Sequence, residues 1–285
     1  MAESTTISGH GAGDVDVVIS VDDVAKQAAE LAQNRPDVAH LESLTKNKSF
    51  LEINNLHAGY GRMEILHDFN LRIGKGQSLC LIGPNGAGKS TILHSIYGFC
   101  DIMSGKISAG DKELTNLSPN TKLSKAGIAY VLQDNSVFPD LTVEENLLMG
   151  GYLLNNQQLA STAADKIFSR YDRLAKRKNQ RAGVLSGGER RLLEISRALI
   201  MEPDILLIDE PSIGLEPRFI NMVFEILTEL KEVDGKTIIM VEQNAKKGLE
   251  FADIGYVLVS GELAMAEDGN ELLKDPAVGR LFLGG

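Results

Sequence analysis

The residues from Gly83 to Thr91 have the types and the spacing that bind a phosphate chain. They fit the pattern G-x-x-x-x-G-K-[ST], in which glycines let backbone N–H groups turn toward phosphate oxygens without a Cβ in the way. Lys89 can reach the β and γ phosphates of a nucleotide, and the Ser90 hydroxyl can ligate Mg²⁺. The predicted nucleotide-binding residues are Gly83, Pro84, Asn85, Gly86, Ala87, Gly88, Lys89, Ser90 and Thr91.

The residues on either side predict the elements that would hold this loop. The apolar run Ser78–Ile82 leads in as a buried strand would, and the helical pattern Ser90–Tyr97 leads out and stops at Gly98, which suits a left-handed helix cap. The start of that helix adds a partial positive charge that favours phosphate. A glycine-rich turn with a stray lysine would need neither element, so the sequence favours a phosphate site.

A pair of carboxylates, Asp209 and Glu210, follows a second apolar run, Ile205–Ile208. Buried parallel strands have such runs, and ligand chemistry in open α/β sheets takes place beyond the carboxyl ends of the strands. The pair could instead cap a helix. Carboxylates placed beyond a buried strand are costly without a function, however, which favours a role in the nucleotide site.

The segment Leu185–Glu189 has two interpretations. Ser186 and Glu189 form the S-x-x-E capping box of the following helix, which would account for both side chains. The box does not require the two glycines between them, Gly187 and Gly188. Backbone N–H groups at these glycines, together with the Ser186 hydroxyl, would make a second helix start that binds phosphate.

The composition is that of a globular protein with an acidic balance. The 285 residues are 43% hydrophobic and 24% charged, with a formal net charge of −10. This charge argues against nucleic acid as the main partner and leaves a local basic patch open. No run of about eighteen apolar residues predicts a membrane span, and Met1–Ser4 does not predict a secretory signal. We interpret the one basic cluster as a solvated helix face: Arg173, Lys176, Arg177, Lys178 and Arg181.

The order of predicted elements divides the chain in two. Residues 1–48 are predicted to be an extension that is largely disordered or partly helical, with a helical period from Val21 to Gln33 that Pro36 would end. In residues 49–285, strands alternate with helices, which predicts an α/β sheet. A mostly helical stretch, Val143–Arg181, predicts a helical insertion at about residues 134–183. Further predicted elements are strands at Phe50–Ile53, Asn70–Ile73, Gly105–Ile107, Ile128–Leu132, Thr237–Val241, Tyr256–Val259 and Glu262–Ala264, a loop at Gly59–Gly61 and a helix at Arg218–Lys231.

Taken together, the phosphate loop, Leu185–Glu189 and the run Ile205–Ser212 resemble the nucleotide-binding subunit of an ATP-binding cassette (ABC) transporter. The order and spacing agree over about residues 49–285. The resemblance implies an α/β fold of the P-loop NTPase ABC cassette type. Such a cassette has a mainly parallel sheet core, an antiparallel β part and a helical subdomain.

The resemblance also implies roles for single residues. Lys89 and Ser90 would contact phosphate and Mg²⁺, Asp209 would associate with Mg²⁺, and Glu210 would be the general base. Gln133 would sense Mg²⁺ and the attacking water. Tyr60 would stack on adenine, although by itself it could be only a loop aromatic. The γ-phosphate bound by an opposite subunit would be contacted by Ser186, Gly187, Gly188 and Glu189. Glu216 would occupy the acidic position of a loop. Gln243 stands where the family has its switch histidine, and its amide can still donate a hydrogen bond.

Several segments narrow the resemblance to the ATPase subunits of importers for branched-chain amino acids and related amides. The similar segments are Val137–Pro139, Thr142–Gly151, Gln180–Gly183, Pro211–Leu215, Val241–Asn244 and Leu283–Gly285. Two places differ. Those subunits usually have Pro-Glu-Gly-Arg where this chain has Leu132–Asn135, and alanine where it has Glu216.

The resemblance implies an ATPase that energises a membrane importer, with ATP and Mg²⁺ as cofactors. Its partners would be integral membrane permease subunits, a second ABC ATPase subunit and, indirectly, a periplasmic solute-binding protein, with no nucleic acid. It would lie on the cytoplasmic face of the inner membrane as a peripheral subunit. The alternatives are a soluble ABC ATPase not coupled to transport and a regulatory protein that barely hydrolyses ATP; Gln133 and Glu210 argue against the regulatory protein.

Overall fold

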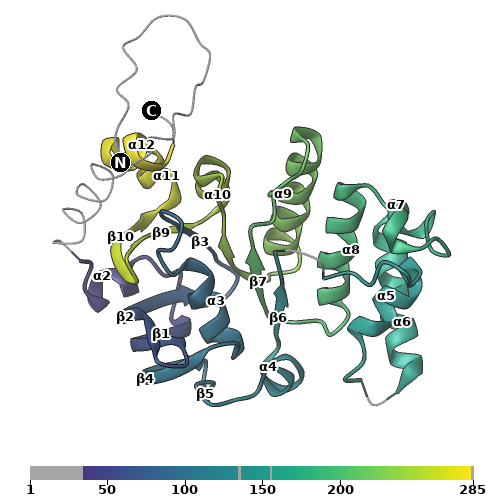
Figure 1. The fold of residues 1–285 in the computed structure, drawn as a ribbon, viewed down its shortest axis with the longest axis horizontal. Helices are drawn as coiled ribbons and strands as arrows, with labels where there is room; N and C mark the ends of the chain where they lie inside the picture. Colours follow the sequence, from purple (N-terminus) through teal and green to yellow (C-terminus); the bar gives the residue numbers. More distant parts are fainter. Residues whose placement is uncertain (1–34, 134–135, 155, 284–285) are drawn as a thin grey trace, which may run out of the picture.

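Two β-sheets and a group of helices form the described part of the chain, residues 35–133, 136–154 and 156–283 of a computed structural model (Figure 1). The predicted helix Val21–Gln33 lies outside these residues. The strand and helix order confirms the predicted α/β class, with parallel and antiparallel sheets and a separate helical part.

The six-stranded sheet is mainly parallel and has the order β10-β9-β3-β8-β7-β6. Pairing is parallel from β9 to β6, and β10 pairs antiparallel with β9. Every residue of β3, β7 and β8 is buried, as continuous apolar runs predict for strands covered on both faces. The bounds are β3 Ser78–Ile82, β6 Ile128–Val131, β7 Ile205–Asp209, β8 Thr237–Val241, β9 Ile254–Val259 and β10 Glu262–Asp268.

The four-stranded sheet is antiparallel, with the order β2-β1-β4-β5. Its strands are β1 Ser49–Tyr60, β2 Met63–Gly74, β4 Asp101–Ala109 and β5 Lys112–Glu113. The first two are longer than predicted, so the prediction that Tyr60 lies in a loop is wrong: it is the last residue of β1. Register shifts between Ile53 and Leu56 interrupt the alternation of buried residues, and this hid the second half of the strand in the sequence.

The helices form two groups. Helices α5 Val143–Gly150, α6 Gln157–Arg170, α7 Asp172–Ala175 and α8 Gly187–Leu199 lie on the right of Figure 1, at the opposite end from the antiparallel sheet. Helices α5, α6 and α7 lie within the predicted helical insertion at about residues 134–183, whereas α8 begins after it. The remaining helices pack around the sheets: α2 Val38–Ser43, α3 Lys89–Tyr97, α4 Pro119–Ala126, α9 Pro217–Glu232, α10 Ala245–Phe251, α11 Gly269–Lys274 and α12 Pro276–Phe282.

Strand β3 lies between two hydrophobic cores. Its residues Leu79 and Leu81 join the core that contains α3 and the antiparallel sheet, whereas Cys80 and Ile82 join the core under α8, α9 and α10. Cys80 is fully buried, as the sequence predicted, and burial raises the pKa of its thiol. Since both faces of β3 are packed, the loop that follows it starts from a rigid element.

The segment 35–48 packs on the domain through α2. Leu41 is completely buried, and the His40 ring lies 2.8 Å from the carbonyl oxygen of Ala266 through its Nε2. Lys46 forms an ion pair with Asp253 at 2.6 Å, and this bond raises the pKa of the lysine. A six-residue helix with one buried leucine has no period that the sequence could reveal.

Deleting residues 1–48 should lower the melting temperature below that of a chain that lacks only residues 1–34. The longer deletion removes the buried Leu41, which is worth about 2–5 kcal/mol by analogy with leucine truncation in cores. For a domain of this size, that loss is on the order of 4–15 °C. Both deletions should bind ATP like the full chain, because the described residues 35–48 do not line the pocket at the phosphate loop. Thermal denaturation and calorimetric ATP titration test this; equal melting temperatures would contradict it.

Candidate active site

The predicted site residues follow neighbouring parallel strands of the six-stranded sheet. The phosphate loop follows β3, the carboxylates Asp209 and Glu210 end or follow β7, and Gln243 and Gln133 come just after β8 and β6. Strands β3, β8, β7 and β6 are adjacent and parallel (Figure 1), so these residues lie together at the carboxyl ends of the strands.

The phosphate loop is closed by its own lysine. Gly88 caps α3 with φ +94°, and a Cβ there would lie 2.9 Å from the Leu66 side chain, so the loop requires glycine at this position. Lys89 Nζ donates to the carbonyl oxygens of Gly83 and Pro84, both at 2.9 Å. Burial lowers the pKa of Lys89. Phosphate oxygens carry charge that these carbonyls lack, so they would be stronger acceptors for the same ammonium.

Asp209 and Ser90 offer a pair of oxygens that suits Mg²⁺. The Ser90 hydroxyl donates to Asp209 Oδ1 at 3.2 Å, and the Tyr130 hydroxyl donates to Oδ2 at 3.1 Å. Asp209 is buried, and hydroxyl and carboxylate oxygens are the ligands that Mg²⁺ prefers. The sequence did not identify Tyr130, whose hydroxyl orients the carboxylate of Asp209. Burial raises the pKa of Tyr130, so it acts as a donor here.

Glu210 is held from two sides. Its carboxylate Oε2 accepts from Gln133 Nε2 at 2.9 Å, and its backbone N–H donates to the carbonyl of Val241 at 2.9 Å. Its backbone has φ +43°, a left-handed conformation that costs a non-glycine residue about 1–3 kcal/mol. The structure thus places the side chain of Gln133 beside the carboxylate of Glu210.

A pocket of about 370 Å³ opens above the loop. Tyr60 is 43% exposed at this pocket, and its hydroxyl lies 2.5 Å from His94 Nδ1, which leaves the ring available for stacking. The pocket is lined by Tyr60, Ile65, Asn85, Gly86, Gly88, Lys89, Ser90, Thr91 and Glu210. The predicted residues that are not part of this lining are Gly83, Pro84, Ala87, Gln133, Ser186–Glu189, Asp209 and Gln243.

The start of α8 has the predicted capping box. The Glu189 N–H donates to Ser186 Oγ at 3.3 Å, and Glu189 Oε2 accepts from the Ser186 N–H at 3.0 Å. A Cβ at Gly188 would lie 2.1 Å from the Phe219 ring, so packing against α9 explains this glycine. Gly187 is exposed, and a Cβ there would lie 3.3 Å from the Leu215 side chain, a tight contact that a small shift of this side chain would relieve.

Comparisons with known proteins show to which family this chain belongs. A family model described as "ABC transporter" matches residues 66–213, more than half of the chain. The chain belongs to the ABC transporter family. The match includes the phosphate loop, α8 and the Asp209–Glu210 pair, so this chain is an ABC ATPase.

The curated relatives agree with the narrower resemblance. The cassette is 42% identical over 235 residues to the high-affinity branched-chain amino acid transport ATP-binding protein BraG of Pseudomonas aeruginosa, covering 82% of this chain and 100% of the relative. It is 38% identical over 229 residues to the probable branched-chain amino acid transport ATP-binding protein LivF of Archaeoglobus fulgidus, covering 80% and 96%.

Solved structures confirm the ABC cassette fold. A nucleotide-free ATP-binding cassette from an ABC transporter superposes with a TM-score of 0.74 at 28% identity, over 83% of this chain and 100% of that chain. A dimeric ATP-binding cassette in a post-hydrolysis state, bound to ADP and Pi, has a TM-score of 0.67 at 25% identity, over 76% and 98%.

In this ABC cassette, a buried glutamate joins the segment that follows β8, which contains Gln243, to the loop after Glu210. Gln243 is exposed directly after β8, while its neighbour Glu242 is buried. Glu242 Oε1 accepts from the Ser212 hydroxyl at 2.7 Å and from the Asn244 N–H at 2.8 Å. Burial raises the pKa of Glu242. No spacing in the sequence indicates this link, which joins two loops of the site.

A buried arginine was also missed in the sequence. Arg191 of α8 donates to the carbonyl oxygens of Leu132 and Asp209, both at 2.8 Å, and pairs with Glu194 at 2.8 Å. These carbonyls directly precede Gln133 and Glu210. Arg191 therefore fixes the distance between the two strand ends that bear the site. In the sequence it resembles any solvent-facing charge of an amphipathic helix.

Replacing Arg191 with methionine should lower kcat by about 10–100-fold with little change in KM, because the loss displaces Gln133 and Glu210 but not the phosphate loop. The double variant with Glu194→Met avoids an unpaired buried carboxylate and should show the same change in kcat with a smaller loss of stability. Arg190→Met is the adjacent control. Steady-state kinetics decide, and a rise in KM at unchanged kcat would contradict the assignment.

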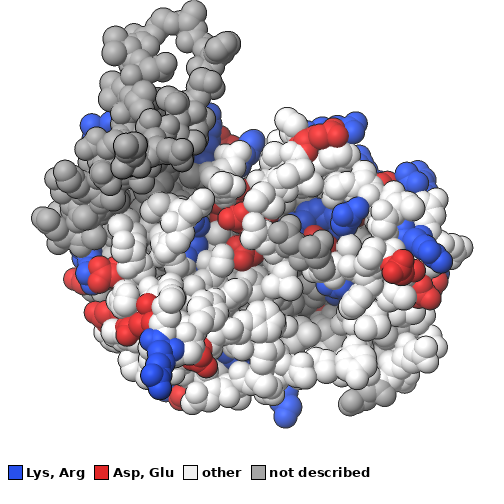
Figure 2. Space-filling view, viewed as in Figure 1, with Lys and Arg blue, Asp and Glu red and all other residues white. Residues whose placement is uncertain are grey.

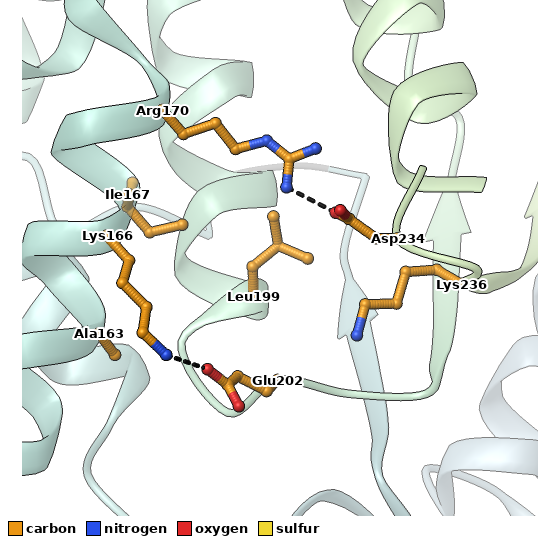
Figure 3. Close-up of a pocket in the computed structure, with 8 residues that line it drawn as sticks. All are labelled: Ala163, Lys166, Ile167, Arg170, Leu199, Glu202, Asp234 and Lys236. Carbon is orange, nitrogen blue, oxygen red and sulfur yellow. Dashed lines mark hydrogen bonds and ion pairs between the residues drawn. The ribbon is translucent and has the colours of Figure 1, made fainter. Parts of the chain in front are cut away.

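Another pocket of the ABC cassette lies near the amino ends of β7 and β8, away from the candidate active site (Figure 3). Lys166 pairs with Glu202 at 2.7 Å, and Arg170 pairs with Asp234 at 2.5 Å. These bonds join α6 to the segments that precede β7 and β8. They connect the helical part to the sheet, so we assign this pocket a structural role.

Charges are mixed on the face drawn in Figure 2, where Lys and Arg lie among Asp and Glu with broad uncharged areas between them. Among the described residues, no helix combines the length and the apolar composition needed to cross a bilayer.

Proposed function

We propose that this chain is the ATP-hydrolysing subunit of an importer for branched-chain amino acids. The observation that carries the proposal is the carboxylate of Glu210, held by Gln133 at 2.9 Å at the edge of the pocket above the phosphate loop. The names of BraG and LivF support the substrate class.

The site residues can perform hydrolysis by positioning and charge neutralisation. Lys89 would leave the Gly83 and Pro84 carbonyls for the β and γ phosphates, and Tyr60 would stack on adenine. Ser90 and Asp209 would hold Mg²⁺, which would supply positive charge to the phosphate oxygens. Glu210 accepts a proton from the water that attacks the γ-phosphorus, the bond to the β-phosphate oxygen breaks, and ADP and phosphate are released.

A second ABC ATPase subunit would complete the site. The pocket lining has no residue of the Ser186–Glu189 segment, and the chain has one phosphate loop and one such segment. We propose that the exposed Gly187 and the start of α8 meet the γ-phosphate bound by the opposite subunit. The dimeric cassette bound to ADP and Pi supports this arrangement.

An apolar surface next to Gln133 would receive the permease. Leu132, Phe138 and Met149 are 36%, 44% and 43% exposed. Met149 also lines a hollow together with Tyr130 and residues of α8. We propose that an apolar segment of an integral membrane subunit packs here and thereby senses Gln133. The ATPase would then be peripheral on the cytoplasmic face of the inner membrane, and a periplasmic solute-binding protein would act through the permease.

Purification and reconstitution test the proposed function. The tagged chain, expressed with its genomic neighbours, should copurify with integral membrane subunits. In proteoliposomes these should take up radiolabelled leucine only with ATP and the binding protein present. Phe138→Asp should prevent copurification without changing ATP affinity, and Val233→Asp, at an apolar residue that is 75% exposed, is the matched control. ATPase activity that neither requires nor responds to membrane subunits would favour the soluble ABC ATPase.

Replacing Gln243 with alanine should lower ATP turnover while ADP binding stays intact. If its amide donates to the γ-phosphate, the loss is about 1–3 kcal/mol, the cost of leaving a charged acceptor without a partner. Gln243→His should stay active, with a pH dependence near the imidazole pKa that glutamine cannot have. ATPase rates against pH in the assembled complex test this. An alanine variant as fast as the native protein would show that Gln243 has no such role.

A further inference from the structure

Two histidines and a glutamate converge on the outer face of the antiparallel sheet. His57 lies on β1, and Glu64 and His67 lie on β2. Glu64 Oε1 is 2.6 Å from His57 Nδ1 and 2.9 Å from His67 Nδ1, and the three ligand atoms all lie within 4.8 Å of one another. None of the three lines the pocket above the phosphate loop.

The strands hold these side chains in place. The pairs Ala58 with Leu66 and Gly59 with Glu64 fix the register of the hairpin. The His67 N–H donates to the carbonyl of Gly261 at 3.0 Å, and a Cβ at Gly261 would lie 3.0 Å from the His67 ring. The three candidate ligand residues therefore lie on paired strands, so a bound ligand would need to order little additional backbone.

The charge pattern of the cluster favours a cation. Among the described residues, the ion pairs of Glu64 are with His57 and His67, and none is with a lysine or arginine. The hydrogen bonds with His57 and His67 lower the pKa of Glu64. A metal ion can replace the two protons that now lie between the rings and the carboxylate.

We propose that His57, Glu64 and His67 bind one divalent ion of the Zn²⁺ class, with water completing the shell. Zn²⁺ takes imidazole nitrogen and carboxylate oxygen at about 2.0–2.2 Å, which sets neighbouring ligand atoms of a tetrahedral site about 3.3–3.5 Å apart. The present separations of 2.6 and 2.9 Å must open by less than about 1 Å. The side chains are 36%, 36% and 43% exposed for His57, Glu64 and His67, so small side-chain rotations can supply this change while the strand backbones stay paired.

Such an ion would join the two strands whose ends border the nucleotide pocket. Tyr60 ends β1 and Ile65 follows Glu64 on β2, and both line that pocket. The Gly261 N–H, in turn, donates to the carbonyl of Ala87 in the phosphate loop at 3.0 Å. The ion would thus stiffen the hairpin that presents Tyr60, a role separate from the Mg²⁺ that Ser90 and Asp209 would hold.

Calorimetric titration of the tag-free, nucleotide-free chain with ZnCl₂ tests the proposal. We expect one equivalent to bind, to raise the melting temperature, and to remain bound in excess Mg²⁺, which disfavours imidazole. His57→Ala, His67→Ala and Glu64→Gln should each weaken binding by more than about tenfold, since even outer partners of metal ligands are worth 10–100-fold.

His40→Ala is the matched control, because its imidazole lies 3.2 Å from a single carboxylate, that of Glu267, on another part of the surface. It should bind Zn²⁺ like the native chain. Circular dichroism and ATP affinity establish that each variant is folded. The proposal is overturned if the native chain binds no Zn²⁺, or if the three folded variants bind it as tightly as the native chain does.

Discussion

Replacing Glu210 with glutamine should leave ATP binding intact and reduce ATP hydrolysis by roughly 10²- to 10⁴-fold, the usual contribution of a positioned general base. Glutamine has nearly the same shape as glutamate, and its carbonyl oxygen can still accept the hydrogen bond that Gln133 now donates to Glu210. It cannot accept a proton from water. The change therefore removes the base and keeps the geometry, which makes the predicted loss specific to kcat.

Single-turnover hydrolysis and ATP titration should be measured together for this variant. Glu232→Gln is the matched control, because it neutralises an exposed carboxylate at the end of α9. It should hydrolyse ATP at the native rate. Near-normal turnover by the Glu210 variant would falsify the assigned role, and a loss of ATP binding would show that Glu210 mainly shapes the pocket.

Much of the fold could be predicted because local patterns determine it. The apolar runs of β3, β7 and β8 are buried on both faces, so their residues form uninterrupted signals. The Ser186 capping box and the Gly98 cap are equally local. In contrast, β1 contains register shifts, and the short α2 is held by tertiary contacts, so neither has a clean period.

The site could be predicted only as far as its residues lie within motifs. The phosphate loop and the Asp209–Glu210 pair are such residues. The contacts that orient them join residues far apart in the chain: Tyr130 with Asp209, and Arg191 with the carbonyls of Leu132 and Asp209. No spacing in the sequence marks these pairs, because strand order and helix packing bring them together.

Replacing Gly187 with glutamate should abolish ATP-dependent dimerisation and lower hydrolysis by at least about 10²-fold. The new carboxylate would lie at the start of α8, where we propose that the γ-phosphate of the opposite subunit binds. Two like charges about 4 Å apart repel by about 4 kcal/mol near a protein surface. The cost to folding should be small, because Gly187 is exposed, the half-buried Leu215 side chain need move only slightly from a Cβ at 3.3 Å, and a carboxylate in the first turn of a helix is favourable.

The Glu210→Gln background makes this measurable, since it should hold ATP and accumulate the dimer for light scattering. There, Gly187→Glu should remain monomeric with ATP bound, because its own phosphate loop is unchanged. Val184→Glu is the control, because it adds the same charge just before α8 at a residue that is 69% exposed and outside the Ser186–Glu189 segment. This variant should dimerise normally. If both glutamate variants form dimers alike, the start of α8 does not contact nucleotide across an interface, and the composite site that requires two chains must be abandoned.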